Sequence, residues 1–256
     1  MNKIRENLNN QNIPSQYKIK ESNKNNKKNQ HKKSQPKNQN TTKIMDIIFI
    51  LDRSGSMSGL EDDTIGGFNG MIKNQKNQNL NDEIYVTTVL FDNTIKMIHN
   101  RTPLKDVKDL TSKDYFVGGS TALFDAIGYT INSNKNSQKN KRADSTIMII
   151  TTDGYENSSR EYNFSQIKNL INERKNKNWE FIFLGANIDS EEFSNKIGID
   201  RDNAINYSAS SKGTQVMYSE MADCMTAIRQ RNISNKQSSN FSVKDSFKKS
   251  KEICNK

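Results

Sequence analysis

The sequence predicts an α/β fold with a doubly wound, mostly parallel central sheet, one antiparallel edge strand and helices on both faces. Three observations support this fold class. Apolar runs rich in strand-forming residues alternate with helical patterns between residues 44 and 228. Several runs are almost continuously apolar, which is typical of parallel strands that are buried on both faces. Polar side chains that carry oxygen follow three of the segments, at the sheet edge where such folds bind ligands.

The chain has 256 residues and divides into a central body and two basic ends. Residues 1–43 hold eleven Lys and Arg against two acids, and the stretch from Arg229 onward holds eight against two. Since the formal net charge is +10, residues 44–228 carry a net charge of −5. We expect disordered basic tails at 1–43 and 232–256 around one domain at 44–231, because the ends have too few apolar residues to offset the entropy of ordering.

The first half of the body predicts two central strands and a hairpin. The segment KIMDIIFILD ends at Asp52 and is nearly continuously apolar. The helical pattern after it contains a Gly66-Gly67 pair, which we attribute to close packing of the helix backbone against the sheet. Glu83–Asp92 predicts a second strand, and a short turn joins it to NTIKMIHN, the expected antiparallel edge.

The second half repeats the alternation of strands and helices. STALFDAIGYTINSNKN and FSQIKNLINERKNKN predict helices, whereas STIMIITTDG and WEFIFLGANID predict buried strands. A short helix containing EEFSNKIG leads to NAINYS, which predicts an edge strand. The closing helix runs from about Gly213 to Arg231, and its methionine stripe has the spacing of a core-facing surface.

The sequence also indicates the cellular compartment in which the protein works. The first thirty residues lack the apolar stretch of a signal peptide, and no apolar run is long enough to span a bilayer. Cys224 and Cys254 are the two cysteines, and their spacing fits free thiols in a reducing compartment rather than a disulfide framework. We therefore expect a cytoplasmic protein.

Three loops place oxygen donors on one rim of the predicted sheet. DRSGSMSG contributes Asp52, Ser54 and Ser56; VGGSTALF contributes Ser120 and Thr121; TTDGYENSS contributes Asp153. An extended loop points alternate residues in the same direction, so the first three can face one ion. Hard cations such as Mg²⁺ prefer oxygen ligands. Helix capping is the alternative for any single loop, and Ser120 fits a cap or a rim contact.

The motifs DRSGSM, GGSTALFDAI and TTDG, in this order and at these separations, resemble the von Willebrand factor A domain family. The metal-ion-dependent adhesion site (MIDAS) of that family consists of Asp-x-Ser-x-Ser, a distant Thr and a distant Asp. The resemblance covers roughly residues 44–230. It implies a metal site formed by Asp52, Ser54, Ser56, Thr121 and Asp153. FNGMIKNQKN and FIFLGANID further resemble small intracellular prokaryotic or phage members.

The resemblance implies metal-dependent protein binding rather than enzyme activity. Mg²⁺ or Mn²⁺ would be held with one coordination position open, and an acidic side chain of a partner protein would fill it. The partner is unidentified, and ATPases are one class with which intracellular relatives work.

Three other functions stay open. A phosphohydrolase of the haloacid dehalogenase type would use Asp52, but Ser54 stands where a second acid is required. GGSTA loosely resembles a nucleophile elbow at Ser120, for which His99 is the candidate base, although a solvent-facing edge histidine is the commoner interpretation. The basic tails would associate weakly with nucleic acid, in a strongly salt-dependent way.

Overall fold

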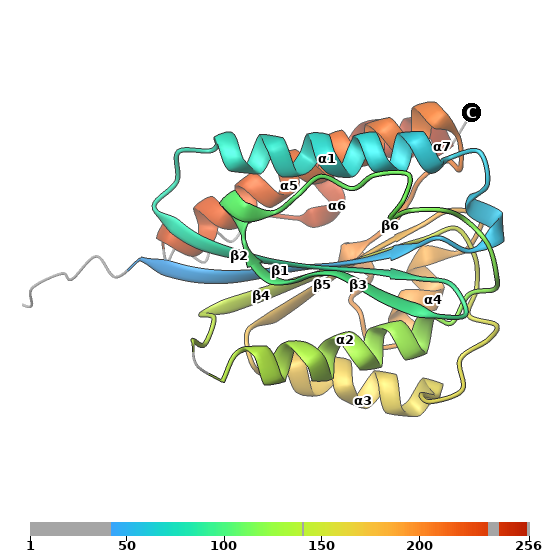
Figure 1. Ribbon diagram of the computed structural model, residues 1–256, viewed down its shortest axis with the longest axis horizontal. Coiled ribbons are helices and arrows are strands. Elements are labelled where there is room, and N and C mark those ends of the chain that lie inside the picture. The colour runs from blue at the N-terminus through green and yellow to red at the C-terminus, as the bar shows by residue number, and fades with distance from the viewer. Residues whose placement is uncertain (1–41, 140, 235–240, 255–256) are drawn as a thin grey trace, which may run out of the picture. The chain divides into compact units, whose positions relative to one another are not determined.

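The computed structural model describes residues 42–139, 141–234 and 241–254. These residues form a six-stranded sheet between two layers of helices (Figure 1). The strand order is β3-β2-β1-β4-β5-β6, and every neighbouring pair is parallel except β2 and β3. The predicted fold class is therefore confirmed, including its antiparallel edge strand.

The strands are β1 (Lys43–Asp52), β2 (Asp82–Phe91), β3 (Ile95–Pro103), β4 (Ser145–Thr152), β5 (Trp179–Gly185) and β6 (Ala204–Asn206). β1 is central because it pairs in parallel with β2 on one side and with β4 on the other. The chain passes from β1 to β2 and β3, and then returns to the other side of β1 to form β4. This reversal of strand order creates a topological switch point between β1 and β4, where ligands bind in such sheets.

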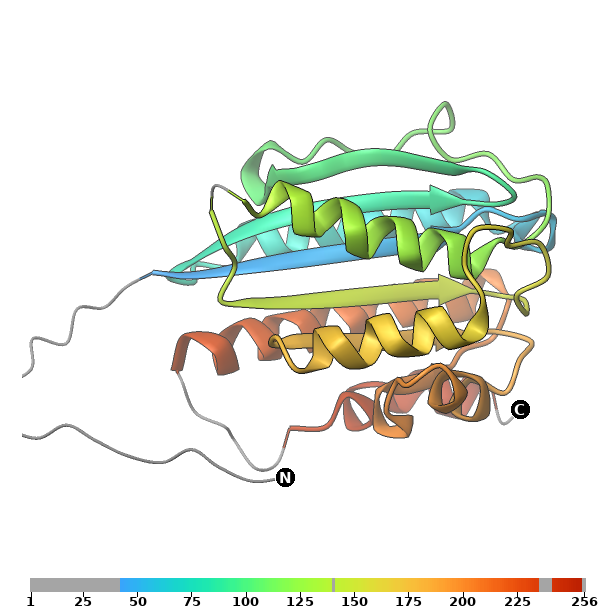
Figure 2. The same cartoon turned by 90° about the horizontal axis from the view of Figure 1, so that it is seen from below.

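Helices cover both faces of the sheet (Figure 1, Figure 2). One layer contains α1 (Glu61–Asn77), α5 (Ser211–Ser234), α6 (Val243–Ser246) and α7 (Lys248–Cys254), and the other contains α2 (Leu123–Ser137), α3 (Phe164–Lys175) and α4 (Ser190–Lys196). Short 3-10 turns occur at η1 (Gly55–Met57), η2 (Leu104–Asp106) and η3 (Arg201–Asn203). β1 supplies both cores, since Phe49 and Leu51 face one layer and Ile48 and Ile50 the other.

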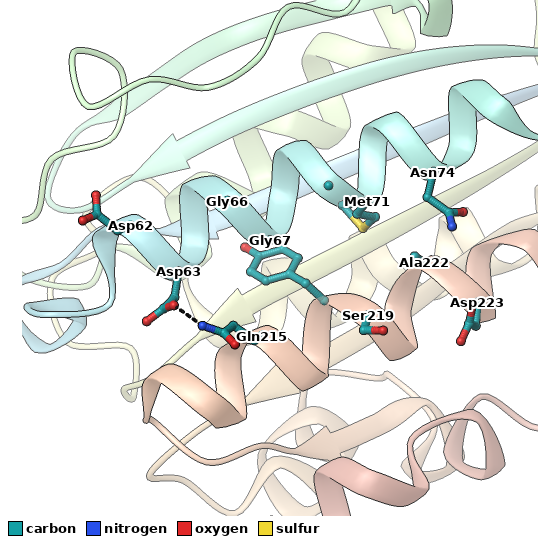
Figure 3. Close-up of a pocket in the computed structure, with 12 residues that line it drawn as sticks. Asp62, Asp63, Gly66, Gly67, Met71, Asn74, Gln215, Ser219, Ala222 and Asp223 are labelled. Atoms are coloured by element: carbon teal, nitrogen blue, oxygen red, sulfur yellow. Dashed lines mark hydrogen bonds between the residues drawn. The ribbon is translucent and has the colours of Figure 1, made fainter.

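α1 and α5 pack side by side (Figure 3). A Cβ added at Gly67 would lie only 2.3 Å from the Tyr218 ring on α5, whereas one at Gly66 would meet nothing within 4 Å. The close approach that we expected between this glycine pair and the sheet is therefore a contact of Gly67 with a helix. At the start of the same contact, Gln215 donates a hydrogen bond of 2.7 Å to Asp63.

A buried ion pair closes the far end of the contact between α1 and α5. Arg229 donates two hydrogen bonds of 2.8 Å to the carboxylate of Asp82, and both side chains are 3% exposed. Its Nη1 also donates to the backbone and side-chain oxygens of Gln75 at 2.9 Å. This bidentate arrangement satisfies a charge that would otherwise be costly to bury.

The prediction of a disordered tail at 232–256 is wrong for the described residues of that range, 232–234 and 241–254. Residues 241–254 form α6 and α7, and Phe247 is fully buried against the core. The Glu220 carboxylate on α5 accepts hydrogen bonds from the backbone of Lys249 and Ser250 and from the Ser250 hydroxyl. A few apolar anchors thus dock an otherwise polar segment. The tail predicted at 1–43 lies outside the described residues, apart from residues 42 and 43, and Lys43 begins β1.

Two further observations concern the membrane and the thiols. Within the part of the chain that the structure describes, no helix is both long and apolar enough to cross a bilayer. Cys224 is buried on α5 and Cys254 is exposed at the end of α7, and both are free thiols.

Candidate metal centre

The predicted metal ligands lie at the carboxyl ends of β1 and β4, beside the switch point. Asp52 is the last residue of β1, and Asp153 directly follows Thr152 at the end of β4. Thr121 lies two residues before the first residue of α2. Because β1 and β4 are parallel neighbours, their ends bring these loops to one edge of the sheet.

The first loop curls so that its polar groups face one another. Asp52 Oδ1 accepts a 2.7 Å hydrogen bond from the backbone N–H of Ser54, and the hydroxyls of Ser54 and Ser56 are 3.1 Å apart. The backbone N–H of Gly55 donates to the carbonyl of Gly119 at 3.1 Å, which joins this loop to the one that carries Thr121. These hydrogen bonds fix the first half of the loop.

The other two residues face the same loop. The Ser56 hydroxyl donates a 2.6 Å hydrogen bond to Asp153 Oδ1. A Cβ added at Gly154 would lie 3.8 Å from both the Ser56 and the Thr121 hydroxyl oxygens, so these two hydroxyls converge on one small space. The structure thus brings together the five residues that the sequence singled out, with Ser120 exposed beside them.

Both carboxyl groups of this cluster have raised pKa values. Burial raises the pKa of Asp52 from 3.8 to about 6, and the nearby Asp153 acts in the same direction, while hydrogen bonds from Thr152 and Ser54 oppose it. Burial also raises the pKa of Asp153, against the hydrogen bond from Ser56. Asp153 Oδ2 is buried and has no hydrogen-bond partner among the described residues. Two adjoining buried carboxylates with an unpaired oxygen are unfavourable unless a cation compensates them.

The donor set fits a hard divalent cation. It consists of two carboxylates and three hydroxyls, the oxygen ligands that Mg²⁺ and Mn²⁺ take. In the described part of the chain, no group of three or more His, Cys, Asp or Glu side chains is placed to hold a metal. The site therefore depends on its hydroxyl groups as much as on its carboxylates.

Several residues that position the cluster were not found from the sequence. The Thr152 hydroxyl donates to Asp52 Oδ2 at 2.6 Å, and the Tyr115 hydroxyl donates to the backbone carbonyl of Asp52 at 2.6 Å. Asn157 Oδ1 accepts the backbone N–H of Thr121 at 2.9 Å. Thr152 belongs to the TTDG motif and directly precedes Asp153, so the motif itself marks it. Tyr115 and Asn157 lie in segments without periodicity, where no pattern marks them.

Two further acids order the loop after β4. Asp125 lies in the first turn of α2, and its carboxylate accepts the backbone N–H groups of Arg160, Glu161 and Tyr162. Glu156 accepts the backbone N–H of Phe124 at 2.8 Å and those of two following serines. These bonds attach the loop to the start of α2, next to Thr121.

His99 does not support a serine nucleophile at Ser120. The prediction of a solvent-facing edge histidine is wrong, because His99 is 6% exposed on β3. Its Nδ1 is 3.0 Å from the Thr88 hydroxyl, and its ring stacks on Phe68 with centroids 6.4 Å apart. The ring is thus part of the packed sheet face.

Comparison with known proteins defines the class. Residues 46–220 match the von Willebrand factor type A domain, so the chain belongs to this family. Domains of this family are commonly metal-dependent protein-interaction modules. No curated protein matches the chain in sequence.

Solved structures share the fold at low identity. The vWF domain of the type V pili tip protein Mfa5 from Porphyromonas gingivalis superposes with a TM-score of 0.54 at 10% identity, over 75% of this chain and 98% of that domain. Proximal thread matrix protein 1 from the mussel byssus, with a zinc-occupied MIDAS motif, gives a TM-score of 0.51 at 12% identity. That comparison covers 72% of this chain and 46% of the mussel protein, so this chain spans less than half of its length.

Proposed function

We propose that the protein is a non-enzymatic module that binds a partner protein through Mg²⁺ or Mn²⁺ held by Asp52, Ser54, Ser56, Thr121 and Asp153. The observation that carries the proposal is the buried Asp153 Oδ2, which lacks a partner among the described residues while Oδ1 of the same group accepts the Ser56 hydroxyl. When bound, the cation would supply positive charge to the two carboxylates and a coordination position for an acidic side chain of the partner.

The chain's own residues hold the ligand groups in place before any ion arrives. The backbone of Ser54 and the Thr152 hydroxyl each fix one oxygen of Asp52. Such supporting hydrogen bonds orient metal ligands and reduce the reorganisation on binding. The zinc-occupied MIDAS of the mussel protein supports testing Zn²⁺ beside Mg²⁺ and Mn²⁺.

Exposed aromatic side chains beside the cluster support a protein partner. Phe116 is 55% exposed and lies under the guanidinium of Arg53, 4.7 Å from its ring centroid. Tyr155, two residues after Asp153, is 52% exposed and packs edge-on against Phe193 at 5.8 Å. Large aromatic side chains around a charged centre provide contact area that a partner can bury.

Affinity capture from native lysate tests this function. The tagged full chain is used in Mg²⁺ or in EDTA, with Asp52→Ala as the disrupting variant. Asp62→Ala is the matched control, because it removes an exposed carboxylate of α1 that is not one of the five ligands. We expect a partner that is retained only in Mg²⁺, by the wild type and by Asp62→Ala. The same proteins captured in all conditions would contradict the proposal.

The cytoplasmic placement belongs to the same proposal. It is supported by the two free cysteines, one buried and one exposed. Thiol titration of protein isolated rapidly from its native cells should find both thiols reduced, whereas an oxidised Cys254 would argue for an oxidising compartment.

A further inference from the structure

A second candidate site lies at the edge of the sheet opposite the metal centre. A cavity of about 310 Å³ is lined by the ends of α2 and α3 and by the first residues of β4 and β5. Figure 2 shows the carboxyl ends of both helices beside the amino end of β4, away from the arrowheads. The cationic residues that line the cavity are Lys135, Lys139, Arg142, Arg174 and Lys177. None of the described lining residues is acidic. We propose that this cavity binds the phosphate groups of a small phosphorylated molecule.

Arg174 is the buried cationic residue of the site. It is 6% exposed, and its Nε is buried without a hydrogen-bond partner among the described residues. Its guanidinium carbon lies 5.7 Å from the ring centroid of Trp179, which orients the group. Buried polar groups are normally hydrogen-bonded, so this N–H lacks an acceptor that a phosphate oxygen would supply.

Neighbouring acids balance only part of the positive charge. Glu173 lies 3.6 Å from Arg174 Nη2 and 2.6 Å from Lys177 Nζ, and it is 46% exposed on α3. The Asp46 carboxylate accepts hydrogen bonds from Arg101, Asn134 and Gln138, so its charge is already compensated by these residues. Lys135, Lys139 and Arg142 form no ion pair with any residue that the structure describes.

Helix capping does not account for the cluster. Lys and Arg are favoured near helix carboxyl ends, where carbonyl groups lack partners. Here a backbone N–H already donates to one terminal carbonyl of each helix, since Gln138 N donates to Asn134 O at 3.0 Å and Lys177 N donates to Arg174 O at 2.8 Å. Lys139, Arg142 and Lys177 lie beyond the last helical residues, Ser137 and Lys175. The charges of Lys139 and Arg142 therefore remain available to a ligand, whereas Lys177 is paired with Glu173.

The shape and composition of the cavity select the ligand class. A volume of about 310 Å³ is at the lower end of the range for small-molecule sites. Five cations favour more than one phosphate group, and Thr146 and Gln138 add neutral polar groups. Trp179 provides an aromatic wall. Inorganic pyrophosphate and ADP are therefore the probes that match this lining.

The single tryptophan of the chain reports on this cavity directly. The full chain is titrated with pyrophosphate, and separately with ADP, to millimolar concentration in EDTA while Trp179 fluorescence is recorded. Calorimetry supplies the dissociation constants. We expect saturable binding of both probes. Arg174→Met keeps the length of the side-chain stem but removes the charge, and should weaken binding at least about tenfold.

A charge-matched pair of double variants keeps the test valid if Arg174→Met fails to fold. Lys139→Gln with Arg142→Gln removes two exposed cations of the cavity, whereas Lys73→Gln with Lys168→Gln removes two exposed cations of α1 and α3 outside it. We expect weaker binding only in the first. Equal weakening in both, or no saturable binding to the wild type, would overturn the proposal. Because EDTA is present throughout, neither result depends on the metal centre.

Discussion

Asp52 is 1% exposed, and burial raises the pKa of its carboxyl from 3.8 to about 6. This shift corresponds to about 3 kcal/mol of free energy that opposes folding when the group is ionised. The hydrogen bonds from Thr152 and Ser54 offset only part of the effect of burial. The residue is thus unfavourable for the metal-free fold, as expected where a side chain is retained for binding.

Asp52→Asn should therefore stabilise the metal-free protein. The amide has the same shape, can accept the Ser54 N–H, and can donate to Thr152, whose hydroxyl then donates to Gly154 O. We expect the free energy of unfolding at pH 7 to rise by about 1–3 kcal/mol in urea denaturation with EDTA. The gain should shrink as the pH falls below about 6, because native wild-type Asp52 is then protonated. A destabilised variant at pH 7 would contradict this account.

His99 gives a pH dependence away from the metal centre. Burial lowers its pKa from 6.5, and Lys76 acts in the same direction, while the Lys108 backbone and Asp114 oppose it. Below pH 6.5 the unfolded chain therefore binds more protons than the native protein. The free energy of unfolding should fall as the pH drops from about 7 to 5. His99→Gln should flatten this part of the profile in urea denaturation, and an unchanged slope would exclude His99 as its source.

The contact between helices α1 and α5 depends on one glycine. Gly67 touches the Tyr218 ring, whereas Gly66, one residue earlier on the same helix, has open space around it. The two positions are adjacent in sequence, but only Gly66 has room for a side chain. They form a matched pair within a single helix.

Alanine substitution at these positions should change stability in opposite directions. Gly67→Ala forces the helices apart and should cost about 1–3 kcal/mol, because overpacking strains a filled contact. Gly66→Ala should stabilise by about 0.5–1 kcal/mol through helix propensity. Chemical denaturation of both variants measures the difference. If Gly67→Ala were as stable as Gly66→Ala, the packing described for α1 and α5 would be wrong.

α6 and α7 behave as part of the domain rather than as a tail. Phe247 is fully buried, so Phe247→Ala should lower the free energy of unfolding by about 3–5 kcal/mol. The neighbouring Lys248 is exposed, and Lys248→Ala should change it by less than about 0.5 kcal/mol. Urea denaturation of the two variants separates the alternatives, since an undocked segment would make both substitutions neutral.

Over the whole chain, the sequence predicts structure best where one physical pattern dominates. β1 can be predicted because its apolar residues are continuous. Asp52 and Asp153 can be predicted as site residues because each stands at the end of such a strand. The segment around α6 docks mainly through the buried side chain of Phe247. The composition of a polar segment does not reveal one such residue. Tyr115 reaches Asp52 across 63 positions of sequence, and no local pattern encodes that distance.

The two candidate sites lie at opposite edges of the sheet and differ in the charge of their side chains. The carboxyl edge gathers Asp52 and Asp153, and the amino edge gathers the cations around Arg174. We therefore propose a cation as the ligand of the first site and an anion as the ligand of the second. The two candidate sites have no residue in common, so each can be tested without the other.

The melting temperature of the full chain in millimolar Mg²⁺ and in EDTA tests directly whether these residues form a metal centre. A cation that binds only the native state raises the melting temperature by mass action. We predict a rise of several degrees for the wild type and for the control Asp62→Asn, and none for Asp52→Asn or Asp153→Asn. An equal rise in all four proteins, or no rise in the wild type, would contradict a metal centre at these residues.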